Sequence, residues 1–148
     1  MTTQEIYLLV VAVLTWYCTG ASWMLQFVCY PTYALVGEQE FVPFHVDFGK
    51  RLLPTAVIPM SITNMLLIAT LLFRPDTVPL WVAALLAVCA AVVMGTTIVL
   101  EVPKHQKLDQ EGKSDSLIAA LVRDNLPRVA CWTLASLLCG YALVLTFA

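Results

Sequence analysis

The chain has 148 residues, of which 60% are hydrophobic and only 12% are charged, and its formal net charge is −2. Soluble domains carry about 25% charged residues, so this composition excludes an ordinary soluble protein. No basic stripe is present, which argues against nucleic acid as a partner.

Four apolar runs without a charged residue divide the chain. Each has about 20 residues or more, enough for a helix to cross a hydrocarbon core of roughly 30 Å. None shows the alternating pattern of a membrane β-barrel. We therefore predict an all-α integral membrane protein. It forms a single four-helix transmembrane bundle over residues 1–148, with helices at about 6–30, 52–73, 78–100 and 128–147.

The first run is expected to remain as a membrane helix, because it lacks a basic leader and is too long for the apolar core of a cleaved signal. Its polar and aromatic residues recur at steps of three and four, so they share one helix face. Such a face serves either ordinary helix packing or a flat cavity wall that stacks on an unsaturated ligand. We predict that it lines a cavity and that Pro31 ends the helix. The face consists of Trp16, Thr19, Trp23, Gln26 and Tyr30.

The segment between the first two runs has the spacing of an amphipathic helix that begins near Pro43. We predict that this helix lies in the cytoplasmic interface of the membrane, with its apolar side toward lipid or the bundle. His45 falls on that apolar side, where it is either a structural residue or part of a site. The apolar side comprises Phe41, Phe44, His45, Phe48 and Leu52.

The second and third runs are joined by a short proline-rich turn, so they should form antiparallel neighbours. Pro59 is expected to kink the second helix. Asn64 lies deep in that helix, where it either links helices by a hydrogen bond or contacts a substrate.

Ionisable residues reappear where the third run ends. Glu101 and His105 are spaced i, i+4 and therefore share a helix face, and Pro103 between them should kink or end the helix. Ionisable groups at a membrane boundary are costly unless they are paired or solvated, so they are functional candidates. The alternative is a plain membrane exit with both side chains among lipid headgroups.

At the start of the fourth run, Asn125, Arg128 and Trp132 also share a helix face. Asn125 is equally suited to cap the helix, and Arg128 to reach lipid phosphates. Ser114 or Asp115 is expected to cap a short helix just before them.

The basic residues are distributed unevenly. Seven of the eight lie in the segments 31–51 and 103–128, and only Arg74 lies in the connection on the other side. The positive-inside rule places those two segments in the cytoplasm and both termini outside it. We therefore expect a bacterial inner-membrane protein whose polar helix ends meet at the cytoplasmic boundary.

The predicted site combines a base, a carboxylate and groups that stabilise negative charge. A histidine would remove a proton from a hydrophobic substrate, Glu101 would tune it, and Asn125 with Arg128 would stabilise the resulting anion. The predicted catalytic residues are His45, Glu101, His105, Asn125 and Arg128, and the predicted substrate-binding residues are Trp23, Gln26, Tyr30, Asn64 and Trp132.

At these residues the chain resembles the anthrone oxygenase-like family of small four-helix membrane proteins. The motif residues here are Pro103, His105 and Leu108 after the third run, and Asn125-x-x-Arg128 with Trp132 at the fourth. The resemblance implies cofactor-free oxygenation, in which a phenolic anthrone loses a proton and its carbanion reacts with dioxygen to give a quinone. The chain departs from the pattern because it lacks an asparagine near His105 and a tryptophan near Leu121 that members often carry.

Three other functions fit the same residues. His45, Glu101 and His105 offer two imidazoles and a carboxylate, which suit an iron or zinc ion or a haem, although no metal motif is present and no cofactor is firmly predicted. A non-catalytic lipid-binding, quinone-binding or assembly subunit is the second alternative. A small multidrug-type transporter is the third and weakest, because every acidic residue lies at a boundary.

The expected partners are membrane lipids and a hydrophobic small molecule, and a homo-oligomer is left open. The five cysteines lie inside the apolar runs, so they are expected to be small buried hydrophobes and not disulfides.

Overall fold

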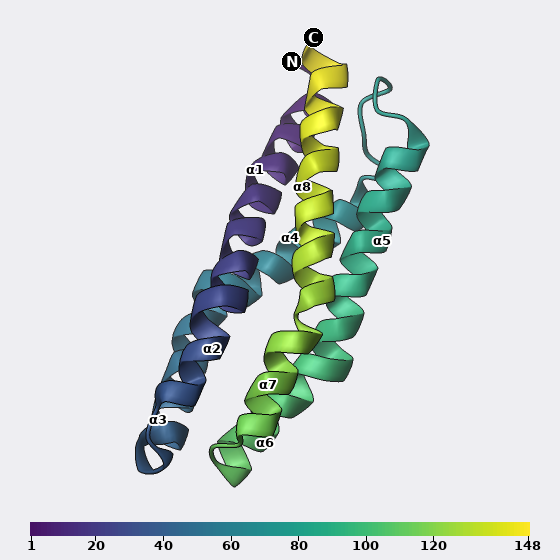
Figure 1. Ribbon diagram of the computed structural model, residues 1–148. Coiled ribbons are helices and arrows are strands. Elements are labelled where there is room, and N and C mark those ends of the chain that lie inside the picture. Colours follow the sequence, from purple (N-terminus) through teal and green to yellow (C-terminus); the bar gives the residue numbers. More distant parts are fainter.

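The computed structural model describes residues 1–148 and is entirely helical. Four long helices alternate in direction, and the N- and C-termini lie at the same end of the bundle (Figure 1). All four are long and apolar enough to cross a membrane, over Thr3–Leu35, Glu38–Ala69, Leu80–Glu111 and Asp115–Phe147. The predicted four-helix architecture is confirmed, and it is consistent with an integral membrane protein.

Each long helix is assembled from shorter segments. The first comprises α1 (Thr3–Met24), the π-helical turn η1 (Leu25–Cys29), α2 (Tyr30–Thr32) and the 3₁₀ turn η2 (Tyr33–Leu35). The second comprises α3 (Glu38–Leu52), the π turn η3 (Leu53–Val57) and α4 (Ile58–Ala69). The third comprises α5 (Leu80–Thr96), the π turn η4 (Thr97–Glu101) and α6 (Val102–Glu111). The fourth comprises α7 (Asp115–Asp124) and α8 (Leu126–Phe147), which are separated by a turn at Asn125.

The three π turns share one sequence feature. In each case the residue after the turn donates its backbone N–H to the carbonyl five residues earlier, and the next residue is a proline. A proline lacks the N–H and its ring clashes with the carbonyl four residues before it. The wider π turn lets the chain pass that point without ending the helix. These donor and acceptor pairs are Tyr30 to Leu25 before Pro31, Ile58 to Leu53 before Pro59, and Val102 to Thr97 before Pro103.

The π turns correct one prediction and bear on two others. The prediction that Pro31 ends the first helix was wrong, because η1 accommodates the proline and the helix continues to Leu35. At Pro59 and Pro103, where kinks were predicted, π turns interrupt the regular α-helical hydrogen bonding and the helices continue.

A helix is also present where the amphipathic spacing predicted one, but α3 is longer than expected. It begins at Glu38 and continues directly into η3 and α4, so only Val36 and Gly37 connect it to the first long helix. Phe41 is buried and Phe48 packs against the core. The location of this helix along a membrane interface remains a prediction.

The helix ends follow ordinary capping chemistry. Thr2 and Glu5 form a capping box at the start of α1. Ser114 caps α7 by accepting from the Leu117 N–H, which confirms the predicted start of that helix. Gly112, with φ of 89°, forms the turn between α6 and α7, in a conformation that few other residues adopt.

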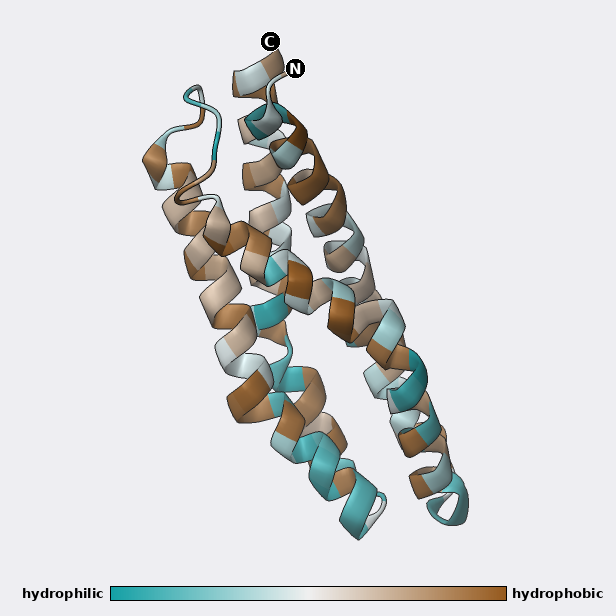
Figure 2. Cartoon of the chain, turned by 180° about the vertical axis from the view of Figure 1, so that it is seen from behind, coloured by the Kyte–Doolittle hydropathy of each residue, from teal (hydrophilic) through white to brown (hydrophobic).

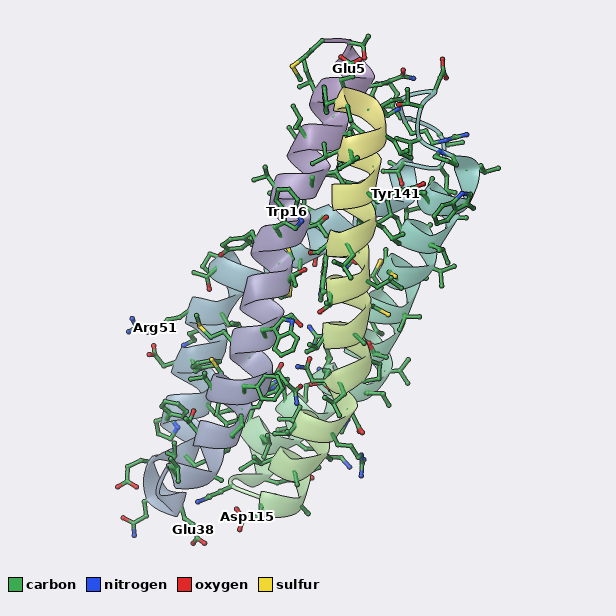
Figure 3. All side chains as sticks on the ribbon, turned by 45° about the horizontal axis from the view of Figure 1, so that its top comes forward. Glu5, Trp16, Glu38, Arg51, Asp115 and Tyr141 are labelled. Carbon is green, nitrogen blue, oxygen red and sulfur yellow. The ribbon has the colours of Figure 1, made fainter.

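The fourth long helix packs against two of the other three. α8 packs against both α1 and α5, and α4 crosses behind α8 to contact α1 and α5 (Figure 1). Hydrophilic residues gather at the end of the bundle away from the termini (Figure 2). Glu38 and Asp115 lie at that end, whereas Glu5 lies at the end with the termini (Figure 3).

Candidate functional site

A cavity of about 590 Å³ lies between the second and third long helices. Its volume falls within the range of small-molecule sites. All three π turns contribute residues to its lining, including Leu25 from η1, Ala56 from η3 and Thr97 from η4. Because π turns are frequent at functional sites, this coincidence marks the cavity as the candidate site.

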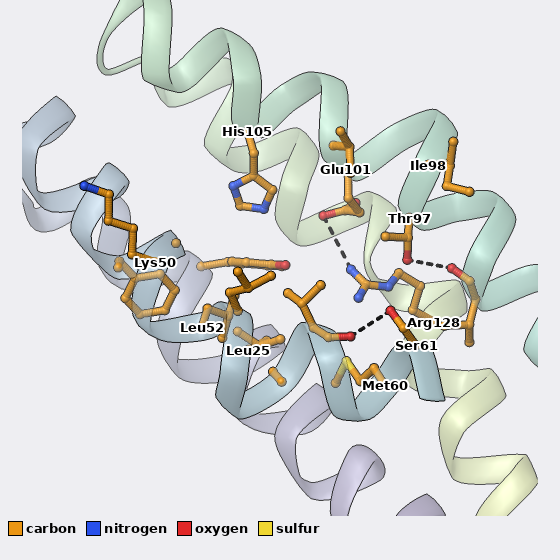
Figure 4. A pocket seen from close by; sticks show the side chains of 18 of the residues that line it. Leu25, Lys50, Leu52, Met60, Ser61, Thr97, Ile98, Glu101, His105 and Arg128 are labelled. Carbon is orange, nitrogen blue, oxygen red and sulfur yellow. Dashed lines mark hydrogen bonds and ion pairs between the residues drawn. The ribbon is translucent and has the colours of Figure 1, made fainter. Parts of the chain in front are cut away.

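A chain of hydrogen bonds runs along one wall of the cavity. His45 on α3 places its Nδ1 2.7 Å from Asp109 Oδ1 and its Nε2 3.0 Å from His105 Nδ1. The remaining nitrogen, His105 Nε2, makes no hydrogen bond within the protein and is not fully enclosed. The His105 ring points into the cavity (Figure 4), so this nitrogen can meet a ligand.

Aromatic side chains fix the planes of the two imidazoles. Phe41 stacks on His45 at a ring-centroid distance of 5.5 Å, and Tyr33 meets His45 edge-on at 5.1 Å. Tyr30 lies 5.7 Å from His105. These contacts and the burial of His45 leave the two rings little room to reorient.

A second polar group is formed by Glu101 of η4 and Arg128 of α8. Arg128 Nη1 lies 3.9 Å from Glu101 Oε2, and both side chains are buried (Figure 4). Neither Glu101 oxygen, nor Arg128 Nε, nor the nearby Asn64 Oδ1 has a hydrogen-bond partner. Buried polar atoms are normally satisfied, so these atoms are available to a ligand's polar groups or to water.

The cavity opens sideways through the wall of the bundle. Its lining includes exposed apolar side chains from η3 and α4 on one side and from α5, η4 and α6 on the other. Fifteen of the 25 lining residues are hydrophobic, so the opening suits an apolar ligand better than a charged one. The exposed residues at the opening are Leu53, Val57 and Met65, and Met94, Ile98 and Val102.

The structure brings six of the ten predicted site residues to the cavity: Tyr30, His45, Asn64, Glu101, His105 and Arg128. Two others form a separate buried network: Asn125 Nδ2 donates to Gln26 Oε1 at 2.8 Å, and Gln26 Nε2 donates to the Val122 carbonyl at 2.9 Å. Trp132 is buried but does not line the cavity.

Most of the polar and aromatic face predicted for the first long helix lies away from the cavity. The Trp23 indole is about half exposed and donates to Thr133 Oγ1 at 3.0 Å. The Trp16 indole, also about half exposed, donates to the Ser136 carbonyl. Both contacts are to α8, because α1 packs its polar face against that helix. Tyr30 is the one aromatic member of the predicted face that lines the cavity.

Sequence reasoning missed Asp109 and Tyr33. Asp109 had a visible signal, because Glu101, His105 and Asp109 follow one another at spacings of four and therefore share a helix face. Tyr33 had none, because it lies beyond the proline at which the first helix was expected to end.

No group of three His, Cys, Asp or Glu side chains converges to hold a metal ion. Both ring nitrogens of His45 are engaged in hydrogen bonds, so in this arrangement it has no free donor for a metal. The five cysteines are all free.

No protein-family model, curated protein or solved structure matches this chain. Its function is therefore inferred from the cavity itself.

Proposed function

We propose that this protein is a small integral membrane enzyme that removes a proton from a hydrophobic substrate. The observation that carries the proposal is the unpartnered His105 Nε2 in a mostly apolar cavity that also contains Arg128. His105 is the general base, and Arg128 stabilises the negative charge that forms on the substrate.

The substrate class follows from the cavity. An apolar body fits the lining, and the sideways opening lets the substrate enter from the hydrocarbon core of a membrane. At the polar end, Arg128 Nε can donate to a substrate oxygen, whereas the Glu101 oxygens can accept from a substrate hydroxyl. We therefore propose a membrane-dissolved substrate that carries both a carbonyl and a hydroxyl group.

The resemblance to the anthrone oxygenase-like family suggests the reaction. A phenolic anthrone would lose a methylene proton to His105, and its carbanion would react with dioxygen. The methylene carbon gives up two hydrogens and gains one oxygen atom, and the second oxygen atom leaves as water.

We also propose the orientation of the bundle. The end that carries most of the basic residues, and with it the cavity, faces the cytoplasm of a bacterial cell, and both termini lie outside. In this orientation α3 begins at the cytoplasmic interface, where its polar side meets water.

The test uses purified protein in detergent with a dihydroxyanthrone as the probe. Oxygen consumption and quinone absorbance are followed together. His105→Ala should lower turnover roughly 10²–10⁴-fold, the usual contribution of a positioned base. Arg128→Ala should also lower it, because the anion loses its cationic partner.

Two exposed neighbours provide matched controls. Gln106→Ala and Arg123→Ala should retain wild-type turnover, since Gln106 is exposed and Arg123 bonds only to the adjacent Asp124. If the wild-type protein retains a co-purified lipid or quinone but turns over no probe, it is a binding subunit and the enzymatic proposal fails.

A further inference from the structure

We propose that Asp109 and His45 are positioning residues that hold His105 in the tautomer whose Nε2 carries a lone pair into the cavity. The inference deepens the proposed function and rests on it, because it explains how the base is kept ready. It also makes a statement about proton positions that is testable without any substrate.

The hydrogen-bond chain determines the tautomers step by step. An ionised carboxylate only accepts hydrogen bonds, so the 2.7 Å contact to Asp109 requires a proton on His45 Nδ1. A neutral His45 then has a lone pair on Nε2, which accepts from His105 Nδ1–H across 3.0 Å. His105, also neutral, is left with a lone pair on Nε2, the nitrogen without a partner in the protein.

The surroundings of the three side chains keep the protons in these positions. The Asp109 side chain is 41% exposed, so water stabilises its charge, whereas the His45 side chain is only 4% exposed. Reversal of the chain would put a proton on His105 Nε2 and block the base. Asp109 prevents the reversal. If the His45 proton were on Nε2, the lone pair on His45 Nδ1 would face the lone pairs of the Asp109 carboxylate, and the two would repel each other.

The same chain of hydrogen bonds also stabilises the protonated His105 that results from proton transfer. When His105 Nε2 takes a proton from the substrate, the electron pair of the broken bond stays on the substrate and His105 becomes a cation. Its Nδ1–H still donates to His45, and the negative charge of Asp109 balances the new positive charge through that ring. A carboxylate orients the histidine of serine proteases by the same logic, and here one imidazole is interposed.

The experiment is nitrogen NMR of the full chain in detergent micelles, with ¹⁵N-labelled histidine and mildly alkaline pH. The protein has only two histidines, and His45→Gln and His105→Gln each remove one set of ring signals. We expect both wild-type rings to be neutral, with protonated Nδ1 and unprotonated Nε2.

Substitutions at Asp109 test its role. Asp109→Leu removes the acceptor with little change in volume and should shift the His105 Nε2 signal toward the protonated form. Asp109→Glu, which restores a carboxylate, should bring the wild-type pattern back at least in part. Glu111→Leu is the matched control, because it removes an exposed carboxylate from the same helix and should change neither ring.

A proton on His105 Nε2 in the wild-type protein overturns the inference, and so does an Asp109→Leu spectrum identical to that of the wild type. If Asp109→Leu does not fold, the wild-type spectrum alone still decides the tautomer. Turnover is measured separately. The expected tautomers without turnover remove only the proposed function, and turnover with the opposite tautomer removes only the role of Asp109 and His45.

Discussion

Glu101 and Arg128 face each other in the interior as a carboxyl group and a guanidinium group, yet they are joined by no hydrogen bond. The cost of removing both charges from water largely cancels their attraction, so a buried pair adds little net stability. Removal of one partner is different, because it leaves the other charge buried and uncompensated. The pair therefore provides reactive polar atoms for the cavity at little net gain in stability.

A double-mutant comparison tests this balance at the residue scale. Arg128→Met should lower the free energy of unfolding, because Glu101 loses the guanidinium group that faces it in the cavity. Glu101→Gln combined with Arg128→Met should recover most of that loss, since no charge then remains buried. Unfolding in denaturant, followed by circular dichroism in detergent, measures both.

Arg123→Met serves as the control and should have little effect, because its side chain is exposed. A double variant that is no more stable than Arg128→Met alone would show that Arg128 stabilises the bundle through its packing and not through the charge of Glu101.

The π turns act at the scale of the element. Each residue of an α-helix advances the chain by about 100° around the axis, so the extra residue of a π turn rotates everything beyond it. In the third long helix, η4 lies between α5 and the segment α6, which carries His105. The contact of His105 with His45 depends on that rotation.

Deletion of Val99 should convert η4 into an ordinary α-helical turn. Val99 is 68% exposed, so its side chain contributes little to packing. α6 should then rotate by about 100° and carry His105 away from His45, and the helix should kink at Pro103, because the proline ring again meets the carbonyl four residues earlier. Most of the helix content should be retained. Circular dichroism checks the helix content, and the NMR signals of the two histidines check whether their hydrogen bond is lost.

Val99→Ala keeps the chain length and should leave the histidine signals unchanged. Paired signals in the deletion variant would mean that the helix absorbs the lost residue elsewhere and that the π turn does not set the position of His105.

The same turns explain which parts of the fold could be predicted. Charge-free runs gave the four helices, because length and hydropathy are local properties of the sequence. Hydropathy does not reveal an extra residue in a turn, so the first helix was expected to end at Pro31, whereas η1 lets it continue to Leu35.

The candidate site was predicted in part for a related reason. The spacing of Glu101 and His105 put them on one face, and the same spacing would have added Asp109. For Trp23 the spacing showed only that it shares a face with Tyr30. Which helix that face meets depends on tertiary packing. The part of the face that carries Trp23 meets α8 and not the cavity.

At the scale of the whole molecule, all four long helices carry exposed large apolar residues. Hydrophilic residues gather at the end of the bundle opposite the termini (Figure 2). This distribution suits a bundle that crosses a membrane and carries its cavity nearer one surface.

Cysteine accessibility tests the proposed orientation. In a background with all five cysteines replaced, Gln110→Cys should react with a membrane-impermeant thiol reagent only after the cytoplasmic side is opened. Asp76→Cys, in the connection at the other end, should react in intact cells. Labelling of position 110 from outside would reverse the proposed orientation.

The contact between α1 and α8 joins the first helix of the chain to the last. Thr19 Oγ1 lies 2.6 Å from Ser136 Oγ, a residue 117 positions later, and the indoles of Trp16 and Trp23 also bond to α8. A ribosome adds roughly 5–20 residues per second, so these groups wait about 6 to 23 s for their partners to be synthesised. Arg128 lies on the same helix, so it reaches the cavity only after the helices that form the other walls have been synthesised. Assembly of the site therefore waits for the synthesis of α8, and a chain interrupted before that helix leaves the indoles of Trp16 and Trp23 without their hydrogen-bond acceptors.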